Sequence, residues 1–286
     1  MHRLLGDLVG LLALERLDRD LFRGNSQDLG WGAIFGGQVL GQALSAATQT
    51  VAPDRHAHSL HGYFLRAGDV RRPILYEVER LRDGKSFSAR RATAVQDGEA
   101  IFSLEASFQV EEPGFDHQDA MPEVPPPETL QSERDMALAI ADRLPEAVRV
   151  RATAERPIEI RPVDVRNPLR PRPAPPRRHL WYRTIDALPD DPRLHRYLLA
   201  YESDFSLLGT SMDPHGVSWL SPGMQVASLD HVMWFHRPFR VDDWLLYDVE
   251  SPSASGARGL VRGRFFDGKG RLVATCAQEG LIRKRG

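Results

Sequence analysis

The pattern of apolar and polar positions changes its period several times along the first half of the chain. Leucines between residues 4 and 14 have the spacing of an amphipathic helix, whereas residues 15–22 are short and mixed, as in a strand. Residues 38–50 return to helical spacing and are rich in Ala and Gly, which is typical of a helix packed closely against a sheet, and Pro53 ends it. Segments rich in Val, Ile, Phe and Tyr, separated by turn residues, then predict strands at 58–66, 74–83, 87–96 and 101–110. One long helix followed by an antiparallel meander is an α+β arrangement.

The second half of the chain repeats this order. Helical spacing over residues 193–212 is preceded by Pro189 and Pro192 and followed by Pro214, which predicts one long helix. Strands are expected on both sides of it, at 157–165, 179–185, 225–237, 244–250, 259–266 and 272–282.

The connection between the halves has a different character. Residues 111–155 are polar and contain three consecutive prolines, and they predict a single short helix at 131–144. We therefore expect an N-terminal unit at 1–115, a linker at 116–155 and a C-terminal unit at 156–286. Residues 166–178 are crowded with Pro and Arg, which predicts a solvated loop or, alternatively, a basic rim that attracts a phosphate-bearing ligand.

A direct internal repeat supports this duplication. Residues 59–79 align with residues 230–250 without a gap, so that Phe64 meets Phe235 and Arg66 meets Arg237. The repeat indicates two copies of one fold, each about 110 residues long. Duplication allows one copy to keep a site that the other has lost.

Composition narrows the class of protein. The chain has 286 residues, 42% of them hydrophobic, and a formal net charge of -2, which argues against a general nucleic-acid binder. Cys276 is the single cysteine, so no disulfide framework and no cysteine-ligated metal site are expected. The sequence contains no apolar run long enough to span a membrane and no signal-cleavage pattern. We therefore expect a cytoplasmic protein with no metal.

The two copies differ at three positions where chemistry would sit. With the repeat offset, a polar residue of the second copy faces a small residue of the first: Asp204 against Ala33, Ser228 against Ala57 and Gln278 against Ser107. Each residue alone has an ordinary explanation, as a solvent-facing helix residue, a strand hydroxyl or an exposed strand amide. Together they are more informative, because the helix, the first strand after it and the last strand must converge in a small sheet wrapped around one helix.

Motifs for other nucleophiles are missing. The sequence has no G-x-S-x-G elbow, no H-E-x-x-H and no G-x-x-x-x-G-K-[ST], so a serine-esterase arrangement, a zincin site and a phosphate loop are not expected. Cys276 lies in a predicted strand, where a cysteine is usually part of the core.

Several runs of residues make the chain resemble the acyl-CoA thioesterase II family, the bacterial and peroxisomal double-hotdog hydrolases. In the first half they are residues 36–43 (GGQVLGQA), 58–69 (HSLHGYFLRAGD) and 82–87 (RDGKSF). In the second half they are residues 203–205 (SDF), 229–239 (LDHVMWFHRPF) and 278–280 (QEG). The resemblance covers almost the entire chain.

The resemblance implies a tandem hotdog fold, in which each unit is a long central helix wrapped by an antiparallel sheet. It implies hydrolysis of fatty acyl-CoA to free acid and CoA without a cofactor, and a homodimer or homotetramer. The family's catalytic Asp, Thr and Gln map onto Asp204, Ser228 and Gln278, so serine replaces threonine here. Serine keeps the hydroxyl but lacks the methyl group that restricts χ1.

Two further residues are candidates for auxiliary roles. Backbone N–H groups at a glycine-rich helix start, such as that of Gly37, would stabilise an oxyanion. His58 lies next to Ala57, the position opposite Ser228, and so would face the same interior; a buried, hydrogen-bonded histidine is the alternative explanation.

Two other functions remain open at this stage. Hotdog folds also host enoyl-CoA hydratases, but Asp230 and His236 are six residues apart in a predicted strand, which is the wrong element for that chemistry. A non-catalytic module that binds acyl-CoA would need neither Asp204 nor Gln278.

Overall fold

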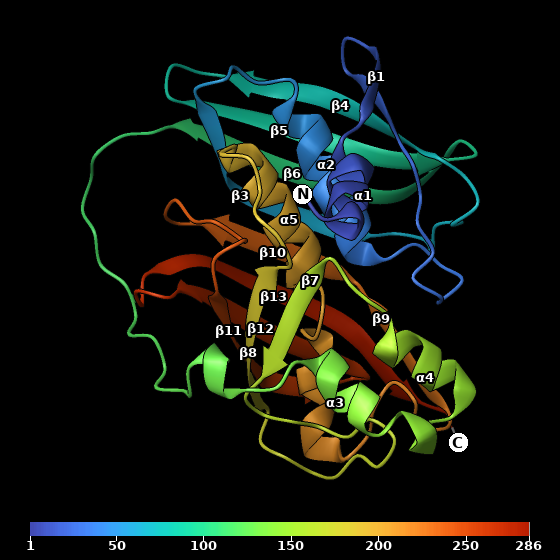
Figure 1. Cartoon of the computed structure of the whole chain (residues 1–286). Helices are drawn as coiled ribbons and strands as arrows, with labels where there is room; N and C mark the ends of the chain where they lie inside the picture. The colour runs from blue at the N-terminus through green and yellow to red at the C-terminus, as the bar shows by residue number, and fades with distance from the viewer. Residues whose placement is uncertain (286) are drawn as a thin grey trace.

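One continuous antiparallel sheet runs through both halves of the computed structural model, which describes residues 1–285 (Figure 1). Its strands follow the order β1-β2-β4-β5-β6-β3-β10-β13-β12-β11-β8-β7, and β9 pairs with β13 beside β10. The halves join where β3 pairs with β10, with Leu60 opposite Met233. The sheet therefore makes the two copies into a single body.

The first half supplies two helices and six strands. Its helices are α1 (Arg3–Leu12) and α2 (Gly36–Thr48). Its strands are β1 (Glu15–Asp18), β2 (Leu21–Gly24), β3 (Arg55–Phe64), β4 (Ile74–Asp83), β5 (Phe87–Gln96) and β6 (Glu99–Val110).

The second half has the same plan. Its helix α5 (Pro192–Ser203) is followed by the 3-10 segment η3 (Leu208–His215). Its strands are β7 (Ile158–Pro162), β8 (Arg177–Thr184), β9 (Met224–Ser228), β10 (Asp230–Phe235), β11 (Leu245–Ser255), β12 (Arg258–Asp267) and β13 (Leu272–Lys284).

The helices α2 and α5 lie side by side on the inner face of the sheet. Glycines on α2 permit this close approach, because a Cβ on Gly37 would lie 2.2 Å from the Tyr201 carbonyl oxygen, and one on Gly41 would lie 3.0 Å from the Tyr197 carbonyl oxygen. Buried Leu44 of α2 and Leu198 of α5 belong to one hydrophobic core that spans both halves. The two central helices thus bring residues of both copies together.

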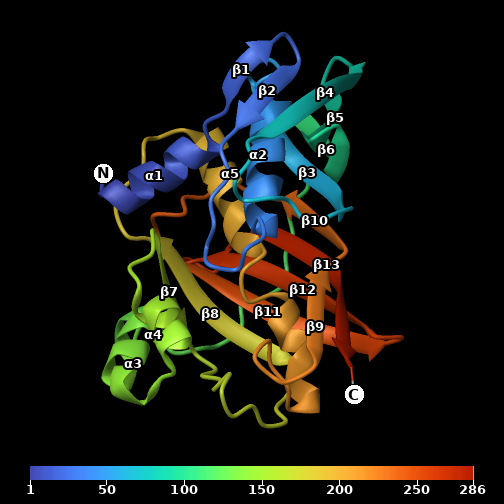
Figure 2. The ribbon, with the colours of Figure 1, turned by 90° about the vertical axis from the view of Figure 1, so that its right-hand side faces the viewer.

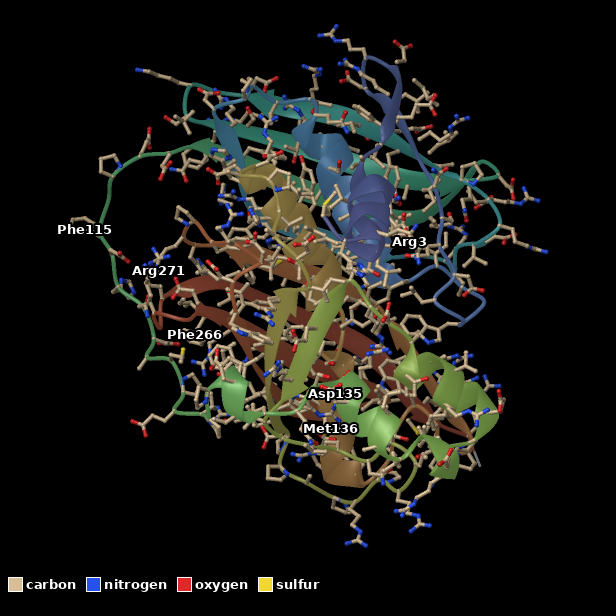
Figure 3. All side chains as sticks on the ribbon, viewed as in Figure 1. Arg3, Phe115, Asp135, Met136, Phe266 and Arg271 are labelled. Carbon is tan, nitrogen blue, oxygen red and sulfur yellow. The ribbon has the colours of Figure 1, made fainter. Side chains whose placement is uncertain are left out.

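The linker is more structured than the sequence predicts. Its turns and helices are η1 (Pro127–Thr129), α3 (Glu133–Ala139), η2 (Ala141–Arg143) and α4 (Glu146–Thr153), and α3 and α4 lie beside β7 and β8 (Figure 2). Before them the chain runs along the outside of the molecule, where Phe115 projects from it (Figure 3). Gln118 ties this connection to the second half, since its amide accepts from the Leu272 N–H and donates to the Gly270 carbonyl oxygen.

Three expectations about elements are corrected. The helix expected at 193–212 ends at Ser203, because Ser206 takes a left-handed conformation (φ 61°) that interrupts it. The strand expected at 225–237 is divided at Leu229, where the pairing with β13 shifts by one residue. The mixed segment 15–22 forms part of a two-stranded hairpin, β1–β2.

No helix within residues 1–285 combines the length and apolar character needed to cross a bilayer.

Candidate active site

The structure brings together the three polar residues that distinguish the second copy. Asp204 is the C-cap residue of α5, Ser228 is the last residue of β9, and Gln278 lies on β13. Ser228 is opposite Gly280 in the β9–β13 pair, and Gln278 is two residues before Gly280 on the same face of the strand. The Gln278 Nε2 group donates a hydrogen bond of 2.8 Å to the Ser228 hydroxyl oxygen.

Asp204 carries an unusual balance of interactions. Burial raises the pKa of its carboxyl group, whereas His231, the Gln278 side chain, the Gly37 N–H and the Ser228 hydroxyl oppose that rise. A carboxylate with a raised pKa is a stronger base than an exposed aspartate, and here several donors face it. The site is therefore equipped to hold and deprotonate a small polar molecule such as water.

The first half contributes the start of α2 to this site. A Cβ on Gly36 would lie 2.7 Å from Asp204 Oδ2, so only glycine fits at the present spacing. The first hydrogen bond within α2 is donated by the Gln38 N–H to the Phe35 carbonyl oxygen. The amides of Gly36 and Gly37 precede it and therefore have no acceptor within the helix. The positive end of the α2 dipole thus faces the carboxylate.

Sequence reasoning missed a fourth member of the site, His231. It is fully buried on β10; its Nδ1 lies 2.6 Å from Gln278 Oε1 and its Nε2 lies 3.0 Å from the Ser203 hydroxyl oxygen. Burial lowers the pKa of His231, while Asp204 and Gln278 oppose that shift. The repeat contained the signal for this residue, because it sets polar His231 of the second copy opposite apolar Leu60 of the first.

His58 does not join this group. Its Nε2 lies 2.8 Å from the Ser107 hydroxyl oxygen, and its ring packs edge-on against Phe87. In the β3–β10 pair, Ser59 is opposite Trp234 and Tyr63 is opposite Asp230, so His58 and Ser228 belong to opposite ends of that pair. The expectation that His58 faces the same interior as Ser228 is therefore wrong; it fits the alternative of a partly buried, hydrogen-bonded histidine.

The expected match between Asp204 and Ala33 is also wrong. Asp204 caps the C-terminal end of α5, and the residue that caps α2 in the same way is Gln49. The repeat offset fails for the helices because the second half inserts η3 between its helix and the next strand. The first copy thus has an amide, not a small apolar residue, at the position of Asp204.

The repeat offset also shifts by one residue at β13. His61 pairs with Glu105, whereas the corresponding Val232 pairs with Ala277, so the residue that matches Gln278 is buried Ala106 and not Ser107 as expected.

Aromatic side chains surround the carboxylate on one side. Phe35 at the start of α2 packs against Phe205 with the rings tilted by 40° and their centroids 4.2 Å apart, and it contacts Tyr201 edge-on. Trp31 lies against Phe35 and remains 52% exposed. An apolar surface therefore adjoins the polar group at the end of α5, as a ligand with both polar and apolar parts would require.

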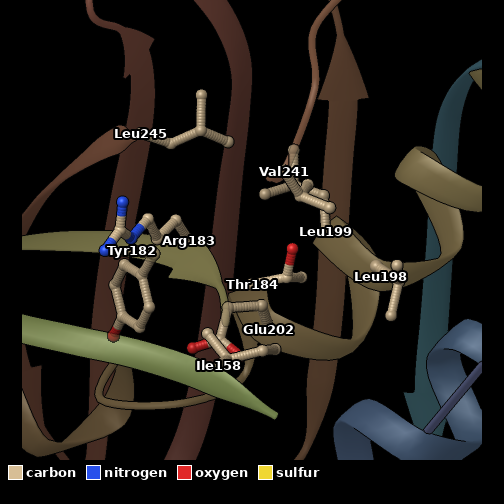
Figure 4. Close-up of a pocket in the computed structure, with 9 residues that line it drawn as sticks. All are labelled: Ile158, Tyr182, Arg183, Thr184, Leu198, Leu199, Glu202, Val241 and Leu245. Atoms are coloured by element: carbon tan, nitrogen blue, oxygen red, sulfur yellow. The ribbon is translucent and has the colours of Figure 1, made fainter. Parts of the chain in front are cut away.

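A separate small cavity lies between α5 and the sheet of the second half (Figure 4). Glu202, Tyr182 and Thr184 line it together with aliphatic side chains. Burial raises the pKa of Glu202 well above its usual range, and its Oε1 has no hydrogen-bond partner among residues 1–285. Asp204 is not part of its wall, so this cavity is distinct from the group described above.

Within residues 1–285, no group of three His, Cys, Asp or Glu side chains is arranged to hold a metal ion.

Comparisons with known proteins identify relatives over the whole length. Residues 26–109 match the family described as acyl-CoA thioesterase N-terminal domain, and residues 147–281 match the family described as acyl-CoA thioesterase. Acyl-CoA thioesterase 2 of Haemophilus influenzae is 46% identical over 283 residues, which cover 99% of each chain.

Solved structures give the same picture. The crystal structure of an acyl-CoA thioesterase II from Mycobacterium marinum is 44% identical, has a TM-score of 0.79 and is matched over 98% of this chain and 99% of its own. A hot dog fold protein from Alicyclobacillus acidocaldarius is 19% identical with a TM-score of 0.77, matched over 98% of this chain and 99% of its own. The expected hotdog architecture is thereby confirmed.

Proposed function

The chain belongs to the acyl-CoA thioesterase family, and from that premise we propose that it hydrolyses fatty acyl-CoA with a water molecule held by Asp204, Ser228 and Gln278. The observation that carries this proposal is the convergence of the three side chains beside the start of α2. They come from three elements of the second half and have no matching set in the first.

The chemistry suits these groups. A thioester carbonyl carbon is already electrophilic, so an oriented water suffices as nucleophile. Asp204 accepts one proton as the water oxygen forms its bond to that carbon, and Ser228 and Gln278 fix the position of the water. The intermediate then collapses, the C–S bond breaks, and the leaving CoA thiolate takes the proton from Asp204. The products are the free acid and CoA.

The developing oxyanion needs donors. The start of α2 lies against Asp204 at Gly36, and the Gly37 N–H hydrogen-bonds to the carboxylate, so backbone donors at the positive end of this helix adjoin the place where the thioester would react. One such donor contributes roughly 10²–10³ in rate in other hydrolases. The first copy would thus stabilise charge while the second activates water.

The aromatic surface of Phe35, Phe205 and Trp31 would accept the start of the acyl chain, because it adjoins Asp204. The chain length that fits is a matter for a panel of acyl-CoA substrates from short to long. The alternative of a hydratase has no support in the geometry, since Asp230 accepts from the Glu279 N–H while His236 bonds to Thr275 beyond the other end of β10.

The deciding experiment compares the wild-type protein with Asp204→Asn, using a thiol-trapping dye to follow CoA release. We expect the variant to fold and to lose roughly 10²–10⁴-fold in kcat, as loss of a general base does. The matched control is Asp54→Asn, on the exposed turn after α2, which should keep full activity. Undiminished turnover in Asp204→Asn, or binding without turnover in the wild-type protein, would refute the proposal.

The assembly and the compartment are also part of the proposal. Tyr63 on β3 and Trp234 on β10 are 63% and 37% exposed on adjacent strands, and such a surface favours packing of a second copy in a homodimer or homotetramer. The single cysteine is buried and unpaired, in keeping with a reducing cytoplasm. Light scattering on the purified chain would measure the assembly directly.

A further inference from the structure

His231 occupies a position where the fold prefers an apolar residue. It is fully buried within β10, and the matching residue of the first copy is Leu60, which is also fully buried. Burying an imidazole is costly unless its nitrogens find partners. Both ring nitrogens of His231 have one: Gln278 Oε1 at 2.6 Å and the Ser203 hydroxyl at 3.0 Å.

The partners determine which nitrogen carries the proton. Gln278 Nε2 donates to Ser228, so its Oε1 is the amide's remaining hydrogen-bonding atom and can only accept. His231 Nδ1 must therefore carry a hydrogen and donate it to Oε1. In the neutral ring Nε2 then has a free lone pair, to which the Ser203 hydroxyl can donate; the Ala200 carbonyl oxygen is the other acceptor within reach of that hydroxyl.

This arrangement fixes the direction of the Gln278 amide. If the amide turned over, its NH₂ group would face the Nδ1–H and its oxygen would face Ser228, so both contacts would change. The Nδ1–H holds the amide with NH₂ toward Ser228 and the carboxylate. A chain of hydrogen bonds thus runs from α5 through β10 and β13 to β9, that is, from Ser203 through His231 and Gln278 to Ser228.

We propose that His231 is a positioning residue, which acts on hydrolysis by locking the Gln278 amide in the orientation that holds the attacking water. The inference rests on the proposed function, because it assigns that water to Gln278 and Ser228. In this role His231 does not touch the substrate.

Three substitutions test whether the Nδ1–H donor, and not only a side chain of this size, is required. His231→Asn keeps an N–H near the place of Nδ1, and His231→Gln moves the amide toward the place of Nε2. His231→Leu introduces the residue that the first copy has at this position. We expect kcat to fall roughly 10–100-fold in the Leu and Gln variants, in the range seen when partners that orient a functional group are lost. KM should change little, and Asn should restore most of kcat. The control is His236→Leu, because His236 follows directly after the end of β10 and bonds to Thr275; its kcat should equal that of the wild type.

A double-mutant cycle tests whether the effect passes through Gln278. In a Gln278→Ala background, His231→Leu should cause no further loss of kcat, because the amide that it orients is gone. Full additivity of the two losses would overturn the proposal and assign His231 a separate role. If Gln278→Ala itself keeps wild-type kcat, the proposed water site fails instead, so the two failures are distinguishable.

A measurement on the wild-type protein keeps the proposal testable even if the Leu variant does not fold. Long-range ¹H–¹⁵N correlation spectra of histidine-labelled protein report the tautomer of each ring. We expect the Nδ1–H form for the resonance that disappears in His231→Asn. The Nε2–H form at this residue would overturn the proposal.

Discussion

Gly36 of the first copy lies directly against Asp204 of the second: a Cβ on Gly36 would come within 2.7 Å of Asp204 Oδ2. The contact joins the free end of α2 to the cap of α5, and it requires that α2 begin with a residue that has no side chain. The two copies therefore share one site across their helices. One supplies backbone donors and space, and the other supplies the titratable and hydroxyl groups.

The first prediction concerns Gly36→Ala. Alanine favours a helix by about 1 kcal/mol over glycine, yet here its methyl group would collide with Asp204 and, at 2.9 Å, with the Phe64 ring. We expect kcat/KM to fall by about 100-fold as the carboxylate is displaced. The measurement is steady-state hydrolysis of one acyl-CoA.

Gly10→Ala is the matched control for this change. Gly10 also lies on a helix, α1, but a Cβ there would have no atom within 4 Å. That variant should keep its activity and gain up to about 1 kcal/mol of stability. Equal kcat/KM in both variants would show that catalysis does not depend on the present distance between α2 and Asp204.

The second prediction concerns the serine at the place where the family has threonine. Ser228→Thr keeps the hydroxyl that accepts from Gln278 and adds a methyl group that restricts χ1, so kcat should be equal to that of the wild type or higher. Ser228→Val has the same shape as the threonine without the hydroxyl. It should lose roughly 10-fold or more in kcat, because the Gln278 donor is left without its partner. An inactive, folded Ser228→Thr would contradict this.

The sequence predicted those site residues that differ in chemical type between the two copies. It predicted less well the residues whose place depends on where a helix ends. Ser228 was found because the strand that it ends keeps the repeat offset, which sets it opposite Ala57. Gln278 was found although its strand is shifted by one residue, so that its true match is Ala106 and not Ser107. The helix does not keep this offset: Asp204 was set opposite Ala33, while its match in the first copy, Gln49, depends on where each helix ends. A left-handed Ser206 that stops a helix has no strong sequence signal.

Most strand positions were predicted, since alternation of apolar residues is a local property. β4 and β5 have the predicted bounds, 74–83 and 87–96. The single sheet and the pairing of β3 with β10 could not be predicted from this local pattern. Pairing between strands far apart in the sequence depends on how the two halves pack against each other. His58 illustrates the same limit: its neighbour in sequence suggested the catalytic interior, and the β-bulge after Ala57 turns it toward Ser107.

The third prediction is the pH dependence of hydrolysis. Asp204 acts as a base only when it is ionised, and burial raises its pKa, so kcat/KM should fall as pH decreases through a value above that of an ordinary aspartate, about 4. Because His231 interacts with Asp204, the apparent pKa of this acidic limb of the pH–rate profile is a property of the two residues together. Gln278→Ala removes a hydrogen bond to the ionised carboxylate and should move the limb to higher pH in the residual activity. A limb that moves to lower pH would contradict the assignment of Asp204 as the base.

The last prediction concerns Glu202, which lines the cavity beside α5 and is only 4% exposed. Its pKa is raised in the folded protein, so between the unfolded value of about 4.3 and that raised value the folded state binds the extra proton. The free energy of unfolding must then decrease as pH rises, by up to about 1.4 kcal/mol per pH unit from this group. Glu202→Gln copies the protonated form and removes this dependence. Urea unfolding at pH 5, 6 and 7 should therefore show the variant gaining on the wild type as pH rises.

Glu77→Gln provides the comparison, because Glu77 is exposed on β4. The free energy of unfolding of this variant should follow that of the wild type at every pH. The difference between the two variants isolates the buried carboxyl, since both substitutions remove one potential charge and only Glu202 lacks solvent to hydrate it. If the free energy of unfolding of Glu202→Gln ran parallel to that of the wild type from pH 5 to 7, this prediction would be contradicted. The Glu202 carboxyl group would then ionise in the folded protein beside a partner admitted through the cavity wall.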